Sequence, residues 1–224
     1  MDSYGNVTQV QNYDWNNLTT PAKTYTYTYL TGTGSHTYIT DYIMNRMLTA
    51  KVIDGTYLLT LATNAYDGGF ANFGPGNLTS STTLAGTSTA GYDSYGNVTT
   101  STNPQSVTTT AAYPSSTNYA APTQFTVGSL TDTISYNSFL APASNTGPNG
   151  DATSILYVNA AKPYTTTSAY GLTTYYSYTT NTSAAMANGR WSRTTMDGLG
   201  RTILVEKGTG STVGVGTVSQ VETT

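Results

Sequence analysis

A short phrase recurs along the chain and constrains its fold more than any other feature. Residues 1–8 read MDSYGNVT and residues 92–99 read YDSYGNVT, so only the first residue differs. Residues 196–202, MDGLGRT, are a looser copy, and residues 66–67 followed by 76–79 match the phrase with an insertion. Re-use of one phrase is typical of an array of similar structural units. It favours a scaffold over a catalytic domain, because repeats mostly build framework and surface.

The chemistry of the phrase predicts a β-hairpin. Aspartate suits the first position of a type I turn, where its carboxylate accepts backbone N–H groups. Glycine three residues later suits the left-handed position of a three-residue loop with a bulge. We therefore assign structural turn roles to the aspartate–glycine pairs Asp2 and Gly5, Asp93 and Gly96, and Asp197 and Gly200.

These phrases, together with residues 189–201 (GRWSRTTMDGLGR), resemble the Tyr-Asp and Asp-x-x-Gly-Arg signatures of the RHS/YD-repeat family. The resemblance runs from residue 1 to about residue 207, with Met in place of Tyr in two copies and no clear copy in residues 100–188. It implies a bacterial protein, secreted or at the cell surface, whose antiparallel hairpins form a coiled β-sheet shell. In many members that shell encloses a C-terminal toxin, so the implied partners are the rest of the parent protein or its cargo domain. The family's self-cleaving segment has no counterpart here.

Alternation and turn residues predict an all-β, antiparallel hairpin array. Residues 24–30 alternate Thr and Tyr and are followed by a Gly-rich turn and a return strand over 36–43. Residues 49–53 and 56–61 flank Asp54-Gly55, a strong hairpin signal. Residues 190–196 and 202–207 form a further hairpin, and more strands are expected near residues 106–112, 123–128, 131–136, 153–158 and 173–180.

The organisation along the chain indicates one repeat region over residues 1–224. Flexible loops are expected near 74–91, which is rich in Gly, Ser and Thr, and near 141–151, where Pro and Gly cluster. Met1 takes the place of Tyr92 in the phrase, and the last residues still read as a strand, so we expect a fragment truncated at both ends.

Composition excludes several classes of function. Charged residues make up 8% of the chain, the net charge is −3, and the Lys and Arg residues are scattered, which argues against nucleic-acid binding. The chain has no Cys, so disulfides and thiolate chemistry are excluded. No stretch is long and apolar enough for membrane insertion, and no signal peptide is visible. We expect no cofactor.

Catalytic and metal-binding residue patterns are weak, and we expect no enzyme. His36 is the single histidine, without the second His or Cys that a zinc site needs. The two glutamates, Glu206 and Glu222, lie in C-terminal strands, and most aspartates fall at turns, which leaves little for glycosidase chemistry. Asp67-Gly68-Gly69 lacks the spacing of a calcium loop.

Two functions remain open. The first is a non-catalytic structural repeat segment of a secreted or cell-surface protein. The second is a carbohydrate-binding or adhesin-like module, in which Tyr25, Tyr27 and Tyr29 share one strand face and stack on cell-surface glycans. Packing of these rings into a core is the competing interpretation, because tyrosine has a large apolar ring and a hydroxyl that reaches a partner.

Overall fold

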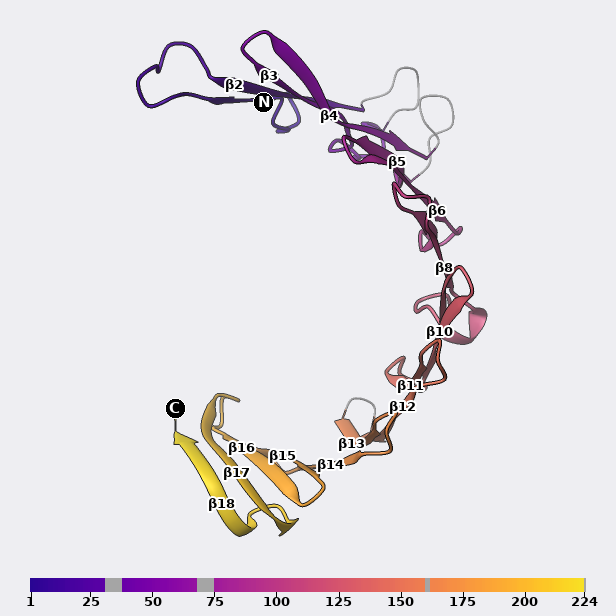
Figure 1. Ribbon diagram of the computed structural model, residues 1–224, viewed down its shortest axis with the longest axis vertical. Helices are drawn as coiled ribbons and strands as arrows, with labels where there is room; N and C mark the ends of the chain where they lie inside the picture. Colours follow the sequence, from indigo (N-terminus) through magenta and orange to yellow (C-terminus); the bar gives the residue numbers. More distant parts are fainter. Residues whose placement is uncertain (31–37, 68–74, 160–161, 224) are drawn as a thin grey trace. The chain divides into compact units, whose positions relative to one another are not determined.

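The structure is a computed structural model that describes residues 1–30, 38–67, 75–159 and 162–223. The fold is all-β: the described residues form eighteen strands and a single 3-10 turn, Ser115–Thr117. Every strand pairing is antiparallel, and paired strands follow one another in sequence (Figure 1). The chain divides into two compact units, Met1–Ala111 and Ala112–Thr224, which are described separately.

The first unit is a meander in which each strand pairs with the strand before it. Its strands are β1 (Gln9–Asn12), β2 (Lys23–Tyr29), β3 (Met47–Asp54), β4 (Tyr57–Tyr66), β5 (Leu78–Thr83), β6 (Gly86–Tyr92), β7 (Val98–Thr102) and β8 (Thr108–Ala112). The buried residues of this unit are Leu30, Tyr38, Ala50 and Asn64. Leu30 N–H donates to Arg46 O, and Tyr38 donates its hydroxyl proton to Asp67 O, which directly follows β4.

The second unit is built in the same way. Its strands are β9 (Gln124–Val127), β10 (Leu130–Tyr136), β11 (Pro142–Thr146), β12 (Ala152–Asn159), β13 (Lys162–Thr167), β14 (Thr173–Tyr178), β15 (Thr182–Ala187), β16 (Arg190–Met196), β17 (Thr202–Thr212) and β18 (Val215–Thr223). Trp191 and Ala184 are its buried apolar residues, so most side chains of this unit keep contact with solvent.

Several predicted strands are present. The hairpin about Asp54-Gly55 joins β3 to β4, with Asp54 opposite Tyr57. The last predicted hairpin joins β16 to β17, where Arg193 lies opposite Glu206. Strands also occupy the five further places where the sequence predicts them.

Other expectations were wrong. The described part of the predicted return strand 36–43 is a turn, with Tyr42 at φ 59°, and β2 pairs instead with β3. The predicted loop 74–91 holds strands β5 and β6, and the predicted loop 141–151 holds β11. Ser and Thr side chains supply cross-strand hydrogen bonds there, such as Thr82 Oγ1 to Thr87 Oγ1 at 2.8 Å, so strands form without aliphatic residues.

Candidate functional site

The repeated aspartate anchors a five-residue turn. Asp93 Oδ1 accepts the N–H groups of Tyr95 and Asn97, both at 2.9 Å, while Oδ2 accepts the Asn97 side-chain amide at 3.0 Å. The backbone closes the turn, since Asp93 N–H donates to Asn97 O and Gly96 N–H donates to Asp93 O. Asp2 makes the same set of contacts with Tyr4 and Asn6.

The turn at Asp197 differs from these two only in the group that Oδ2 contacts. Its Oδ1 accepts the N–H groups of Leu199 and Arg201, and its Oδ2 accepts Arg201 Nε–H at 2.7 Å. Gly5, Gly96 and Gly200 all have positive φ, of 85°, 87° and 80°. The aspartate and glycine of the phrase therefore hold turn geometry.

The same backbone turn also occurs where the sequence shows no copy of the phrase. The two closing hydrogen bonds recur seven times in the described residues, at 2–6, 93–97, 103–107, 137–141, 147–151, 168–172 and 197–201. Asn103 and Asn137 replace aspartate as side-chain acceptor, and Ser106 and Leu140 replace glycine at the positive-φ position. For these two turns the available signal was an Asn three positions before a residue other than glycine. The turns at 147–151 and 168–172 instead begin with Gly147 and Ser168 and keep glycine at the positive-φ position.

Hydrogen bonding lowers the pKa of the three turn aspartates. For Asp2 and Asp93 the main cause is the side-chain amide of Asn6 or Asn97, followed by backbone N–H groups. For Asp197 the N–H and the guanidinium of Arg201 both lower the pKa. The carboxylates are therefore held ionised as turn acceptors, the opposite of the raised pKa that a general acid requires.

Tyrosines tie neighbouring strands together at the edge where the phrase lies. Tyr92, at the end of β6, donates its hydroxyl proton to the carbonyl of Leu78 at the start of β5, at 2.9 Å. Similar bonds join tyrosines at or near strand ends to carbonyls at or just before the beginning of the preceding strand: Tyr29 to Val7, Tyr66 to Met47, Tyr136 to Pro122 and Tyr157 to Pro142. Tyr92, which precedes the turn aspartate Asp93, therefore joins two strands through its hydroxyl group.

The three tyrosines predicted to bind glycans lie on β2. Tyr25 lies opposite Val10 and Val52, and Tyr27 lies opposite Ala50, so these two rings belong to an apolar row across β1 to β3. All three are half-buried, and the Tyr29 hydroxyl is bonded to Val7 O at 3.0 Å. This environment suits packing. Glycan binding by Tyr25, Tyr27 and Tyr29 stays a prediction. A glycan array that compares the unmodified chain with the Tyr27→Ala variant tests it.

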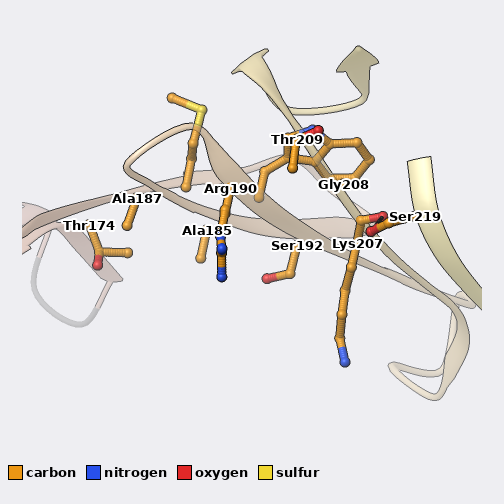
Figure 2. A pocket seen from close by; sticks show the side chains of 11 residues that line it. Thr174, Ala185, Ala187, Arg190, Ser192, Lys207, Gly208, Thr209 and Ser219 are labelled. Carbon is orange, nitrogen blue, oxygen red and sulfur yellow. Dashed lines mark hydrogen bonds between the residues drawn. The ribbon is translucent and has the colours of Figure 1, made fainter. Parts of the chain in front are cut away.

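A hollow in the second unit has a volume of about 460 Å³ and lies over β14 to β18. Arg190, Ser192 and Lys207 line it and point to the same side of the sheet (Figure 2). Strand register explains this arrangement, because Ser192 lies opposite Lys207 and Arg190 lies opposite Ala187. We call this side the Lys207 face. The opposite side, which carries Trp191, Met186 and the Arg193–Glu206 ion pair, is the Trp191 face.

Within the described ranges, no three His, Cys, Asp or Glu side chains gather closely enough to hold a metal ion. His36 lies outside the described residues. Nor does any helix in those ranges have the length and hydropathy needed to cross a membrane.

Comparison with protein-family models found no match, and comparison with curated proteins found none either. Among solved structures, the chain is similar to the crystal structure of TcdB2-TccC3, at 13% identity and a TM-score of 0.41, covering 85% of this chain and 11% of that chain. It is similar to TcdB2-TccC3-TEV at 13% identity and a TM-score of 0.39, covering 90% and 11%. A third similar structure is the Photorhabdus luminescens Tc holotoxin pore, at 12% identity and a TM-score of 0.40, covering 85% and 10%. The chain spans about a tenth of the length of these chains.

Proposed function

We propose that this chain is a non-catalytic structural segment of a longer RHS-type protein, in which one face of the β-sheet packs against another part of that protein. The single observation that carries the proposal is the amount of exposed surface. The chain exposes 14106 Å² for 23.6 kDa. One globular protein of that mass exposes about 9,800 Å², and two globular bodies of half the mass together expose about 11,800 Å².

The exposed surface includes apolar side chains on the Trp191 face of the second unit. Leu156 is 62% exposed, Tyr175 50% and Val221 58%. Strand register places them on one side, because Leu156 and Tyr175 both lie opposite Thr165, and Val221 lies opposite Glu206. Exposed apolar side chains on one face of a sheet favour a surface that is covered by a partner.

The finer form of the proposal draws on the resemblance of the repeated phrase to RHS/YD repeats. In that form the segment is part of a shell around a C-terminal toxin, and the parent protein is bacterial and acts outside the cell or at its surface. The partners are then the remaining repeats and the cargo domain. Neither catalysis, nucleic-acid binding nor membrane insertion is part of the proposed role.

The test compares the isolated chain with the complete protein, whose limits are found by sequencing the DNA on both sides of the reading frame. Leu156→Asp and Val221→Asp are introduced into both forms, with Gln220→Asp on the Lys207 face as the matched control. We expect the two Trp191-face variants to lower the thermal midpoint of the complete protein and to leave that of the isolated chain nearly unchanged. A reading frame that begins at residue 1 and ends at residue 224 would overturn the proposal. So would equal changes of the thermal midpoint in the isolated chain and in the complete protein.

A further inference from the structure

The Lys207 face of the second unit carries a second hollow beside the one in Figure 2. Its volume is about 400 Å³, and Lys162, Tyr164, Tyr176 and Tyr178 line it. Tyr176 lies opposite Ala185, which also lines the hollow with Arg190 and Lys207, so the two hollows open on the same side of the sheet. We call them the tyrosine hollow and the cation hollow.

The tyrosine hollow offers aromatic surface with a cation beside it. Tyr164 is 51% exposed, and Lys162 Nζ lies 5.3 Å from the centre of the Tyr178 ring. Tyr176 is held in place by a 3.2 Å hydrogen bond between its hydroxyl and Thr166 Oγ1. Rings fixed in this way can stack against the apolar side of a flat ligand without a large entropic cost.

The cation hollow offers positive charge that the protein does not neutralise. Arg190 and Lys207 are exposed, and the ion pairs of the described residues do not include either of them. Arg193, by contrast, is paired with Glu206 on the Trp191 face, at 2.7 Å. In the described part of β13 to β18, the single carboxylate on the Lys207 face is Glu222, opposite Val205. Ser192 and Thr174, which carry hydroxyl groups, also line this hollow.

Small side chains separate the two hollows and keep the path between them open. Ser183 and Ala185 lie on β15 between the tyrosines of β14 and the polar residues of β16. From β14 to β17 the path crosses three strand spacings, or about 14 Å. A ligand that contacts both hollows at once must therefore be an extended chain.

We infer that the Lys207 face binds an acidic polysaccharide, with sugar rings stacked on Tyr164 and Tyr176 and carboxylates bound by Arg190 and Lys207. The guanidinium group suits a carboxylate because it donates two parallel hydrogen bonds. The hydroxyl groups of Ser192 and Thr174 match the hydroxyls of a sugar. A nucleic acid fits less well, because it carries a phosphate on every nucleotide and this face supplies three cations on a chain of net charge −3.

This inference does not depend on the scaffold role, because the apolar surface used there is on the Trp191 face. The test measures binding of the full 224-residue chain to polygalacturonate oligomers, to neutral dextran oligomers and to a single-stranded DNA oligonucleotide. Isothermal titration calorimetry at low and high salt supplies the affinities. The variants are Arg190→Gln, Lys207→Gln and Tyr164→Ala, and the control is Lys51→Gln, which removes a cation from β3 in the first unit.

We expect polygalacturonate to bind, dextran to bind far more weakly, and affinity to fall as salt rises. Each cation variant is expected to weaken binding about threefold, and both together about tenfold. Lys51→Gln is expected to bind like the unmodified chain, and circular dichroism checks that all variants keep the fold. Absent binding of polygalacturonate, equal weakening by Lys51→Gln, or tighter binding of the oligonucleotide would each overturn the inference.

Discussion

The indole ring of Trp191 lies against the α-carbon of Gly208 on the neighbouring strand, where a β-carbon would collide with the ring. The two residues are cross-strand partners on β16 and β17. A methyl group at position 208 would lie 2.7 Å from Trp191 Cε2 and would also meet the carbonyl of Thr217. This contact buries Trp191 to 3% exposure in a sheet whose side chains are mostly solvated.

Gly208→Ala is therefore expected to lower the free energy of unfolding by about 1–3 kcal/mol, the usual cost of overpacking. Urea denaturation followed by tryptophan fluorescence measures it. Trp191 should also become accessible to a collisional quencher, whereas Trp15, at 94% exposure, is accessible already. Gly147→Ala is the control, because its new methyl group would meet only Asp151 O at 3.8 Å. Equal stability of the two variants would show that the ring moves freely.

Two glycines in one turn differ in backbone conformation but not in the space around them, so substitutions there test the effect of conformation alone. Gly200 has φ +80° and Gly198 does not have a positive φ, while a β-carbon would meet nothing within 4 Å at either position. Gly200→Ala is expected to cost about 1 kcal/mol because an L-residue is strained there. Gly198→Ala is expected to be neutral, or to stabilise by about 0.5 kcal/mol by restricting the unfolded chain. Thermal unfolding of both variants checks the order, and the reverse order would contradict the turn geometry.

The hydroxyl bond of Tyr92 is expected to be worth about 1 kcal/mol, as for a typical intramolecular hydrogen bond. Tyr92→Phe removes the donor to Leu78 O and keeps the ring. Tyr170→Phe is the matched control, because Tyr170 is 96% exposed and its ring lies in solvent. Chemical denaturation of the two variants measures the difference. If Tyr92→Phe and Tyr170→Phe lower the free energy of unfolding equally, the hydroxyl bond of Tyr92 contributes nothing to stability.

Acid is expected to destabilise the turns. The pKa of Asp93 in the folded protein lies below the ordinary value of 3.8, so the unfolded chain takes up the proton first as pH falls. The stabilisation from this carboxylate is therefore complete above the unfolded pKa and is lost as pH falls from about 4 through the folded pKa. Thermal midpoints measured from pH 7 to pH 2.5 should fall in this range.

The Asp93→Asn variant should show a smaller decrease of the thermal midpoint as pH falls. Asparagine keeps an Oδ1 acceptor for the turn amides, as Asn103 does in its own turn, but it does not titrate. At pH 7 the variant should be slightly less stable, because the amide of Asn97 loses its carboxylate partner. An unchanged pH profile would place the acid sensitivity elsewhere in the chain.

Local turn chemistry could be predicted from the sequence, and strand partners could not. Asp54-Gly55 forms its hairpin because few residue pairs tolerate the backbone of so tight a turn. The partner of β2 was missed because residues 38–42 form a turn, in which Tyr38 is buried and donates its hydroxyl proton to Asp67 O, in place of the predicted return strand. Strands β5 and β6 were missed because their Ser and Thr side chains show no apolar alternation.

The cation hollow could not be predicted either. Arg190 and Lys207 are far apart in sequence, and a one-residue change of register between β16 and β17 would put them on opposite faces. That register contains a bulge between Thr195 and Met196, which no sequence pattern marks. Tyr92 before the turn aspartate Asp93 was visible in the phrase, but its hydroxyl partner is a backbone carbonyl, which leaves no trace in the sequence.

The tyrosine ties have a consequence for how such a sheet grows. Each of these tyrosine hydroxyl bonds joins a strand to the strand before it and to no other. The bonding pattern therefore does not depend on the total number of strands. Inserting or deleting a whole hairpin leaves every remaining tie intact. A protein built in this way can change its length by duplication or loss of single hairpins, without redesign of the parts that remain.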